Sequence, residues 1–126
     1  MKLLLAEDDI DFGNILSQYL IMSGFEVTLA RNGREAWDIF HDARPDICIL
    51  DIMMPEMDGY MLTRQIKADR RFAGVPVIMH SSLSGMSNQQ LGMSVGVDEY
   101  VPKFEPQRLS QTLARLLSAD AAAGGR

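Results

Sequence analysis

Short apolar runs alternate along this chain with longer segments whose apolar residues recur at helical spacing. The short runs lie at residues 3–6, 25–30, 46–50, 75–80 and 97–101. The helical segments lie at residues 11–22, 34–41, 60–69, 87–95 and 106–117. Several runs are apolar at consecutive positions, which is typical of parallel strands covered on both faces. The alternation therefore predicts an α/β fold with a doubly wound, five-stranded parallel sheet.

The length of 126 residues suits one domain, and an apolar share of 47% is enough to bury a core. We expect that domain to span residues 1–118. Residues 119–126 are mostly small or polar and show no periodicity. They are predicted to form a flexible C-terminal tail, or the beginning of a linker.

Charge and composition bear on the partners and the compartment. The net charge of −5 opposes binding to phosphate backbones, so we expect no nucleic-acid partner. The apolar run after Met1 stops at Glu7, which is too short for a secretion signal or a membrane span. Cys48 is the only cysteine, so no intramolecular disulfide can form. These features favour a cytoplasmic protein without a membrane association.

Charged and hydroxyl side chains follow four of the predicted strands at their carboxyl ends. They are Glu7, Asp8 and Asp9 after the first strand, Asp51 after the third, Ser81 and Ser82 at the fourth, and Lys103 after the fifth. Parallel strands in such a sheet bring their carboxyl ends to one edge, where ligands bind. We therefore expect these side chains to gather at a single site.

This set of side chains suits phosphoryl transfer. Crowded carboxylates repel one another, and Mg²⁺, which prefers oxygen ligands, relieves that repulsion. A carboxylate such as Asp51 can act as the nucleophile and form an aspartyl phosphate. Lys103 would neutralise charge on the transferring group, and the Ser81 hydroxyl would donate a hydrogen bond to it. The pattern favours a magnesium-dependent phosphoacceptor site.

Residues 51–59, DIMMPEMDG, match the D-x-x-x-P-x-x-D-G signature of response regulator receiver domains. The acidic cluster, the strand over 76–81 and the pair Tyr100 and Lys103 follow in the order of that family. The chain thus resembles the CheY-like superfamily from residue 2 to about residue 118. The resemblance implies a flavodoxin-like (βα)5 receiver fold. From Met54 onward the chain is most similar to the receivers of CheV-type chemotaxis coupling proteins, and residues 2–50 resemble transcription-factor receivers, as in a mosaic.

The resemblance implies a role for each residue of the acidic site. Asp51 corresponds to the phosphoacceptor and also to a metal ligand. Asp8 corresponds to the direct metal ligand, and Glu7 to its neighbour that acts through water. Met53 would offer its backbone carbonyl to the metal. The implied metal is Mg²⁺, with Mn²⁺ as a substitute.

The remaining site residues correspond to the parts of a switch. Ser81 resembles the switch hydroxyl, Tyr100 the aromatic residue that changes rotamer with it, and Lys103 the lysine that contacts the phosphoryl group. The family implies a histidine kinase as phosphodonor and a downstream protein partner bound through the face of the fourth helix, fifth strand and fifth helix. It also implies a monomer or a phosphorylation-dependent dimer. Such a chain catalyses its own phosphorylation and slow dephosphorylation, and is not an enzyme of the ordinary kind.

Two departures from the family pattern support an alternative. Phe104 follows Lys103 where receivers usually carry a proline, often in a cis bond. A cis bond before a non-proline residue costs about 2.5–4 kcal/mol, so we expect a trans bond here. Ser82 replaces the usual alanine or glycine beside the switch residue. The alternative is a degenerate receiver that binds protein partners independently of phosphorylation.

Other polar residues are expected to have structural roles. Asp9 is predicted to cap the first helix, and Asp58 with Gly59 to form a turn and helix start. His80 lies inside an apolar strand, which is typical of a core or rim histidine rather than a ligand. An aspartyl phosphohydrolase is disfavoured, because Met53 stands where such enzymes carry a second acid.

Overall fold

The structure is a computed structural model, and it describes residues 1–81, 95–103 and 105–124. Its strands are β1 (Lys2–Ala6), β2 (Glu26–Ala30), β3 (Ile47–Leu50), β4 (Val77–Ser81) and β5 (Glu99–Pro102). Its helices are α1 (Ile10–Met22), α2 (Gly33–Ala43), α3 (Gly59–Ala68) and α5 (Pro106–Gly124). The helix predicted over residues 87–95 lies almost entirely outside the described residues.

The strands form one parallel sheet with the order β2-β1-β3-β4-β5. This is the flavodoxin-like order, so the predicted doubly wound five-stranded sheet is confirmed. The register pairs Ala6 of β1 with Leu50 of β3, and Leu50 with Met79 of β4. The residues that follow β1 and β3 therefore emerge side by side at the carboxyl edge of the sheet.

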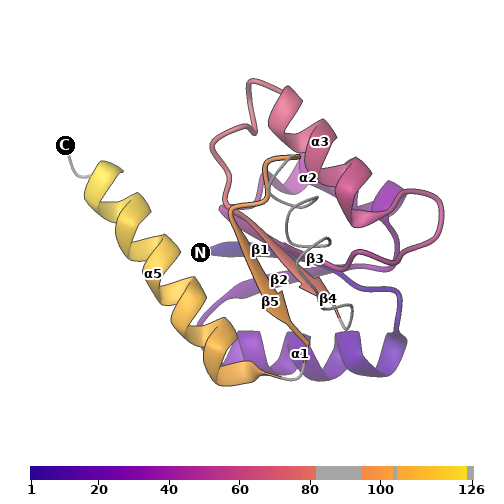
Figure 1. Cartoon of the computed structure of the whole chain (residues 1–126). Coiled ribbons are helices and arrows are strands. Elements are labelled where there is room, and N and C mark those ends of the chain that lie inside the picture. The colour runs from indigo at the N-terminus through magenta and orange to yellow at the C-terminus, as the bar shows by residue number, and fades with distance from the viewer. Residues whose placement is uncertain (82–94, 104, 125–126) are drawn as a thin grey trace.

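Helices cover both faces of the sheet (Figure 1). One core lies between the sheet and α1 with α5, and includes Leu3, Leu5 and Ile49. The other lies between the sheet and α2 with α3, and includes Leu4 and Leu50. All four residues of β3 are buried, which explains why its sequence is apolar at consecutive positions.

Side-chain caps begin the first three helices. Asp9 Oδ1 accepts a hydrogen bond from Phe12 N at 3.0 Å, which confirms the predicted cap of α1. Asp58 Oδ1 accepts from Met61 N at 2.8 Å and confirms the predicted helix start at α3. Asn32 caps α2 in the same way. Caps of this kind contribute about 1 kcal/mol each to the stability of the protein, and they fix the residue at which each helix begins.

The last helix is longer than the sequence pattern predicted. We expected it to end at residue 117 and to be followed by a tail over 119–126, but α5 continues to Gly124. Residues 119–123 are alanine except at one position, and alanine has the highest helix propensity of all residues. These alanines can therefore extend α5 without the periodic apolar residues by which the rest of the helix was predicted. Figure 1 shows the C-terminal end of α5 pointing away from the sheet.

Among the described helices, no stretch is both long and apolar enough to cross a membrane.

Candidate functional site

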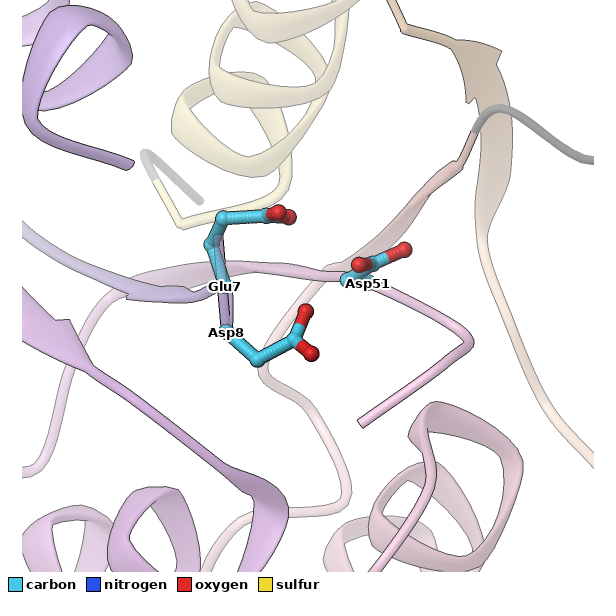
Figure 2. Close-up of side chains that lie close together, drawn as sticks. All are labelled: Glu7, Asp8 and Asp51. Atoms are coloured by element: carbon cyan, nitrogen blue, oxygen red, sulfur yellow. The ribbon is translucent and has the colours of Figure 1, made fainter. Parts of the chain in front are cut away.

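Three carboxylates converge at the carboxyl edge of the sheet. Glu7 and Asp8 directly follow β1, and Asp51 directly follows the neighbouring strand β3. One oxygen from each carboxylate lies within 4.8 Å of the other two. Figure 2 shows the three side chains directed toward a common region. The sequence prediction that these residues form one site is therefore confirmed in its geometry.

The three carboxylates differ in their access to solvent. Glu7 is 1% exposed and Asp51 is 4% exposed, whereas Asp8 is exposed. A cleft of about 400 Å³ opens beside Asp8, and Met53 and Asp58 also line it. Met53 is 62% exposed at the rim of this cleft. Of the three carboxylates, Asp8 is therefore the one that lines this cleft.

Lys103 is the cation that the fold places between the two buried carboxylates. Its Nζ donates to Glu7 Oε1 at 3.0 Å and to Asp51 Oδ2 at 3.2 Å. Burial opposes its charged form, but the hydrogen bond to Glu7 and the charge of Asp51 raise the pKa of Lys103 overall. The lysine is therefore charged and neutralises part of the acidic cluster. Its predicted position at the site is confirmed.

Burial opposes the charged form of the Glu7 carboxylate. The pKa of Glu7 is raised to about 7, mainly by burial and also by the charge of Asp51, against the lowering effect of Lys103. Glu7 Oε2 is buried, and no described residue hydrogen-bonds to it. Buried carboxylate oxygens with excess negative charge suit a hard divalent cation with oxygen ligands. The donor set of Glu7, Asp8 and Asp51 therefore fits Mg²⁺.

We expect the raised pKa of Glu7 to make the metal-free protein less stable at higher pH. Glu7 releases its proton near pH 7 in the folded protein, but near its ordinary pKa of 4.5 when unfolded. The folded state thus binds more protons between these values, so the free energy of unfolding falls as the pH rises from about 5 to about 7. Added Mg²⁺ should raise the melting temperature more at pH 8 than at pH 5, as circular dichroism can measure. The Glu7→Gln variant is the control and should show a flatter pH profile. Equal stabilisation by Mg²⁺ at both pH values would contradict this account.

Of the two predicted switch residues, the structure describes the side chain of Tyr100 but not that of Ser81. Ser81 is the last residue of β4, at the same edge as the acidic cluster, but its side chain is outside the described part of the chain. Ser82 and Phe104 also fall outside it, as does the predicted conformation of the Lys103–Phe104 bond. Tyr100 lies on β5 and packs against the core between the sheet and α2 with α3. Its hydroxyl is buried without a hydrogen-bond partner in the described residues.

His80 lies in the core, as predicted. It is 3% exposed and sits on β4. Burial, with a smaller effect of the Lys103 charge, lowers the pKa of His80 to about 4. Its imidazole is therefore neutral at physiological pH and does not belong to the acidic cluster.

The sequence predicts a turn and helix start at Asp58 and Gly59, and the structure adds a close approach of Gly59 to the backbone of Asp51. A Cβ atom at Gly59 would lie 2.2 Å from the backbone oxygen of Asp51. Gly59 N also donates to Ile52 O at 2.9 Å. The start of α3 is therefore packed directly against the segment that carries Asp51. The sequence signal for this position is the pair Asp58-Gly59. The pair predicts the helix start, but the contact of Gly59 with the Asp51 backbone depends on tertiary packing.

The fold and the site together define a receiver domain of two-component signalling. The family model for the response regulator receiver domain matches residues 3–114, and the chain belongs to this family. Receiver domains of this family take part in phosphorylation-dependent signalling, bind Mg²⁺ at an acidic pocket, and interact with histidine kinases and downstream partners.

Curated relatives include transcriptional regulators. The chain is 38% identical over 117 residues to the "Probable transcriptional regulator ycf27" of Guillardia theta, covering 92% of this chain and 45% of that protein. It is 34% identical to the "Response regulator MprA" of Mycolicibacterium vanbaalenii, covering 92% of this chain and 48% of that protein. The chain thus spans about half the length of these relatives. Because the ycf27 relative is a transcriptional regulator by name, the predicted exclusion of nucleic acid is not supported.

Solved structures of receivers superpose closely on this chain. The receiver domain of a signal transduction histidine kinase from Syntrophus aciditrophicus has 34% identity and a TM-score of 0.86, covering 94% of this chain and 90% of that one. The chemotaxis protein CheY4 of Vibrio cholerae has 31% identity and a TM-score of 0.85, covering 90% of this chain and 96% of that one. Receivers from different signalling contexts therefore share this fold.

Proposed function

We propose that Asp51 accepts a phosphoryl group from the phosphohistidine of a histidine kinase, and that the phosphorylated chain signals to a protein partner. The observation that supports this most strongly is the position of Lys103, whose Nζ hydrogen-bonds both Glu7 and Asp51. A buried carboxylate beside a charged lysine and two further acids has the parts that phosphoryl transfer requires.

In this proposal the Asp51 carboxylate is the nucleophile. Its oxygen forms a bond to phosphorus as the bond between phosphorus and the donor's imidazole nitrogen breaks. Lys103 is 3.2 Å from Asp51 Oδ2, so its ammonium group can pair with the phosphoryl oxygens without a large movement. Asp8, Asp51, the Met53 carbonyl and Glu7 through water would hold Mg²⁺ or Mn²⁺. When bound, the metal supplies positive charge to the transferring group.

The proposed output is a change of population between two states of the face that includes β5 and α5. The Ser81 hydroxyl would donate a hydrogen bond to the new phosphoryl group, and Tyr100 would change its rotamer with that movement. An unpaired buried hydroxyl costs about 1–3 kcal/mol, so the buried position of Tyr100 without a described partner is compatible with a second rotamer. Phosphorylation would then favour one of the two states.

Backbone amide chemical shifts test this switch. We expect beryllofluoride with Mg²⁺ to shift amide signals around Asp51 and also along β5 and α5, because the phosphoryl mimic changes the population of the distant face. The Asp51→Asn variant under the same conditions is the control and should show no such shifts. Shifts confined to the acidic site of the wild-type protein would contradict the proposed output face.

The alternative is a degenerate receiver that binds its partner without phosphorylation. It would need no particular geometry among Glu7, Asp51 and Lys103. Hydrogen bonds of 3.0 and 3.2 Å from Lys103 to the two buried carboxylates support the phosphoaccepting function instead. In the alternative, partner binding would be the same for the wild-type protein and the Asp51→Asn variant.

We also propose that the chain is a mosaic, similar to CheV-type coupling-protein receivers from Met54 onward and to transcription-factor receivers over residues 2–50, on the strength of its motifs. The match to the ycf27 regulator runs over 117 residues and does not separate the two halves. For the oligomeric state we propose a monomer or a phosphorylation-dependent dimer.

A further inference from the structure

An aromatic side chain from α1 lies beside the lysine of the site. Lys103 Nζ is 4.9 Å from the centroid of the Phe12 ring, in the geometry of a cation–π interaction. On its other side, the Phe12 ring stacks on His80, with ring centroids 5.5 Å apart and an angle of 24° between the planes. The three side chains come from three different elements: Phe12 from α1, His80 from β4, and Lys103 from the segment after β5.

The Phe12 ring differs in kind from the other groups that contact the ammonium of Lys103. Glu7 and Asp51 both hydrogen-bond to it, but both carboxylates also belong to the acidic cluster that fits a metal. A carboxylate that binds a cation, or that carries a phosphoryl group, attracts the lysine less. The π face of Phe12 takes no part in either event. Its attraction for the ammonium group therefore persists when the carboxylates are engaged.

His80 is suited to support the ring. It is 3% exposed, so its position is determined by packing rather than by solvent. Within the described residues its Nδ1 has no hydrogen-bond partner, so stacking and burial hold the imidazole. Because burial keeps the imidazole neutral, it adds no charge that would repel Lys103.

We propose that Phe12, supported by His80, is a positioning residue that holds the Lys103 ammonium beside Asp51 for phosphoryl transfer. Phe12 does not contact the transferring group in this proposal, and it acts through the lysine. The inference rests on the proposed function of Asp51 as phosphoacceptor. It makes one aromatic position of α1 a determinant of the phosphorylation rate.

The test compares Phe12→Leu with Phe12→Tyr. Leucine keeps an apolar side chain but removes the π face, and tyrosine keeps the ring. We expect Phe12→Leu to lower the maximal phosphorylation rate with a small phosphodonor about fivefold, because a cation–π interaction contributes a modest free energy. Mg²⁺ affinity should stay within about twofold, since the ring is not a metal ligand. Phe12→Tyr should keep nearly the full rate.

A nuclear magnetic resonance signal reports the contact without phosphorylation. We expect the ring current of Phe12 to shift the ε-methylene signal of Lys103 upfield, and this shift should disappear in Phe12→Leu and remain in Phe12→Tyr. The matched control is Leu16→Val, which reduces a buried side chain one turn along α1 and leaves the ring in place. This control should retain both the shift and the rate.

Two results would overturn the inference. One is a folded Phe12→Leu variant that is phosphorylated at the wild-type rate. The other is an equal loss of rate in Phe12→Leu and Leu16→Val, which would assign the effect to packing. A wild-type protein that forms no adduct on Asp51 would instead overturn the proposed function, and the two failures are therefore distinguishable.

Discussion

Replacement of Lys103 by methionine is expected to destabilise the metal-free protein strongly at high pH. The lysine side chain is 11% exposed and pairs with two carboxylates that are at most 5% exposed. Removing one partner of a buried ion pair leaves an uncompensated charge and costs about 3 kcal/mol or more. At pH 5 the loss should be much smaller, because Glu7, with a pKa of about 7, is then protonated.

Denaturant unfolding at about pH 8 and about pH 5, without Mg²⁺, measures the effect of Lys103→Met. The control is Arg34→Met, which removes a cation from an ion pair whose side chains are 67% and 69% exposed. An exposed pair contributes little, so this variant should stay within about 0.5 kcal/mol of the wild type. If Lys103→Met were as stable as the wild type at both pH values, the electrostatic description of the site would be wrong.

Gly59→Ala is expected to have the second large effect. The new methyl group would lie 2.2 Å from the Asp51 oxygen and 3.0 Å from the Asp51 carbonyl carbon. Both are backbone atoms at the end of a buried strand, so the contact can be relieved only if α3 or the phosphoacceptor segment moves. Overpacking of this kind costs about 1–3 kcal/mol, and we expect the upper end of that range. Phosphorylation should fall as well, because Asp51 is displaced.

Gly74→Ala is the matched control for this prediction. A Cβ atom at Gly74 would have no described atom within 4 Å. The substitution should therefore change the free energy of unfolding by less than about 0.5 kcal/mol, or raise it slightly. Chemical denaturation of both variants, with intact mass after phosphorylation, measures the two effects. A Gly59→Ala variant with wild-type stability and phosphorylation would contradict the contact.

The fold was predictable because strands that are buried on both faces of a sheet are apolar at consecutive positions, and such runs are easily found in the sequence. Each strand lies close to its predicted range, but β4 begins at Val77 and not at residue 75. Val75 is apolar, yet its N–H donates to Phe72 O in a turn, and Pro76 has no N–H to give to a ladder. Apolar character alone cannot distinguish such a turn from the strand that follows it.

The helix α1 shows a second limit of pattern reasoning. Its apolar residues at helical spacing included Leu16 and Leu20, which are buried, and also Ile15, which is 70% exposed. The pattern identified the helix, but it did not identify which of its apolar residues face the core.

The candidate site was predictable to the extent that strand ends determine it. Glu7, Asp51 and Lys103 follow parallel strands, so their convergence needed only the strand assignment. The contacts of Phe12 and Gly59 could not be predicted in the same way. They depend on how a helix packs across the sheet edge, and neither residue type carries charge or reactive chemistry that would have indicated a role.

The central claim is that Asp51 accepts a phosphoryl group in a magnesium-dependent reaction. Intact mass of the protein after incubation with a small phosphodonor tests it most directly, with and without Mg²⁺ and beside the Asp51→Asn variant. This account predicts a single phosphoryl adduct on the wild-type protein that requires Mg²⁺, and none on Asp51→Asn. An adduct of equal yield on Asp51→Asn, or no adduct on the folded wild-type protein with Mg²⁺, would contradict it.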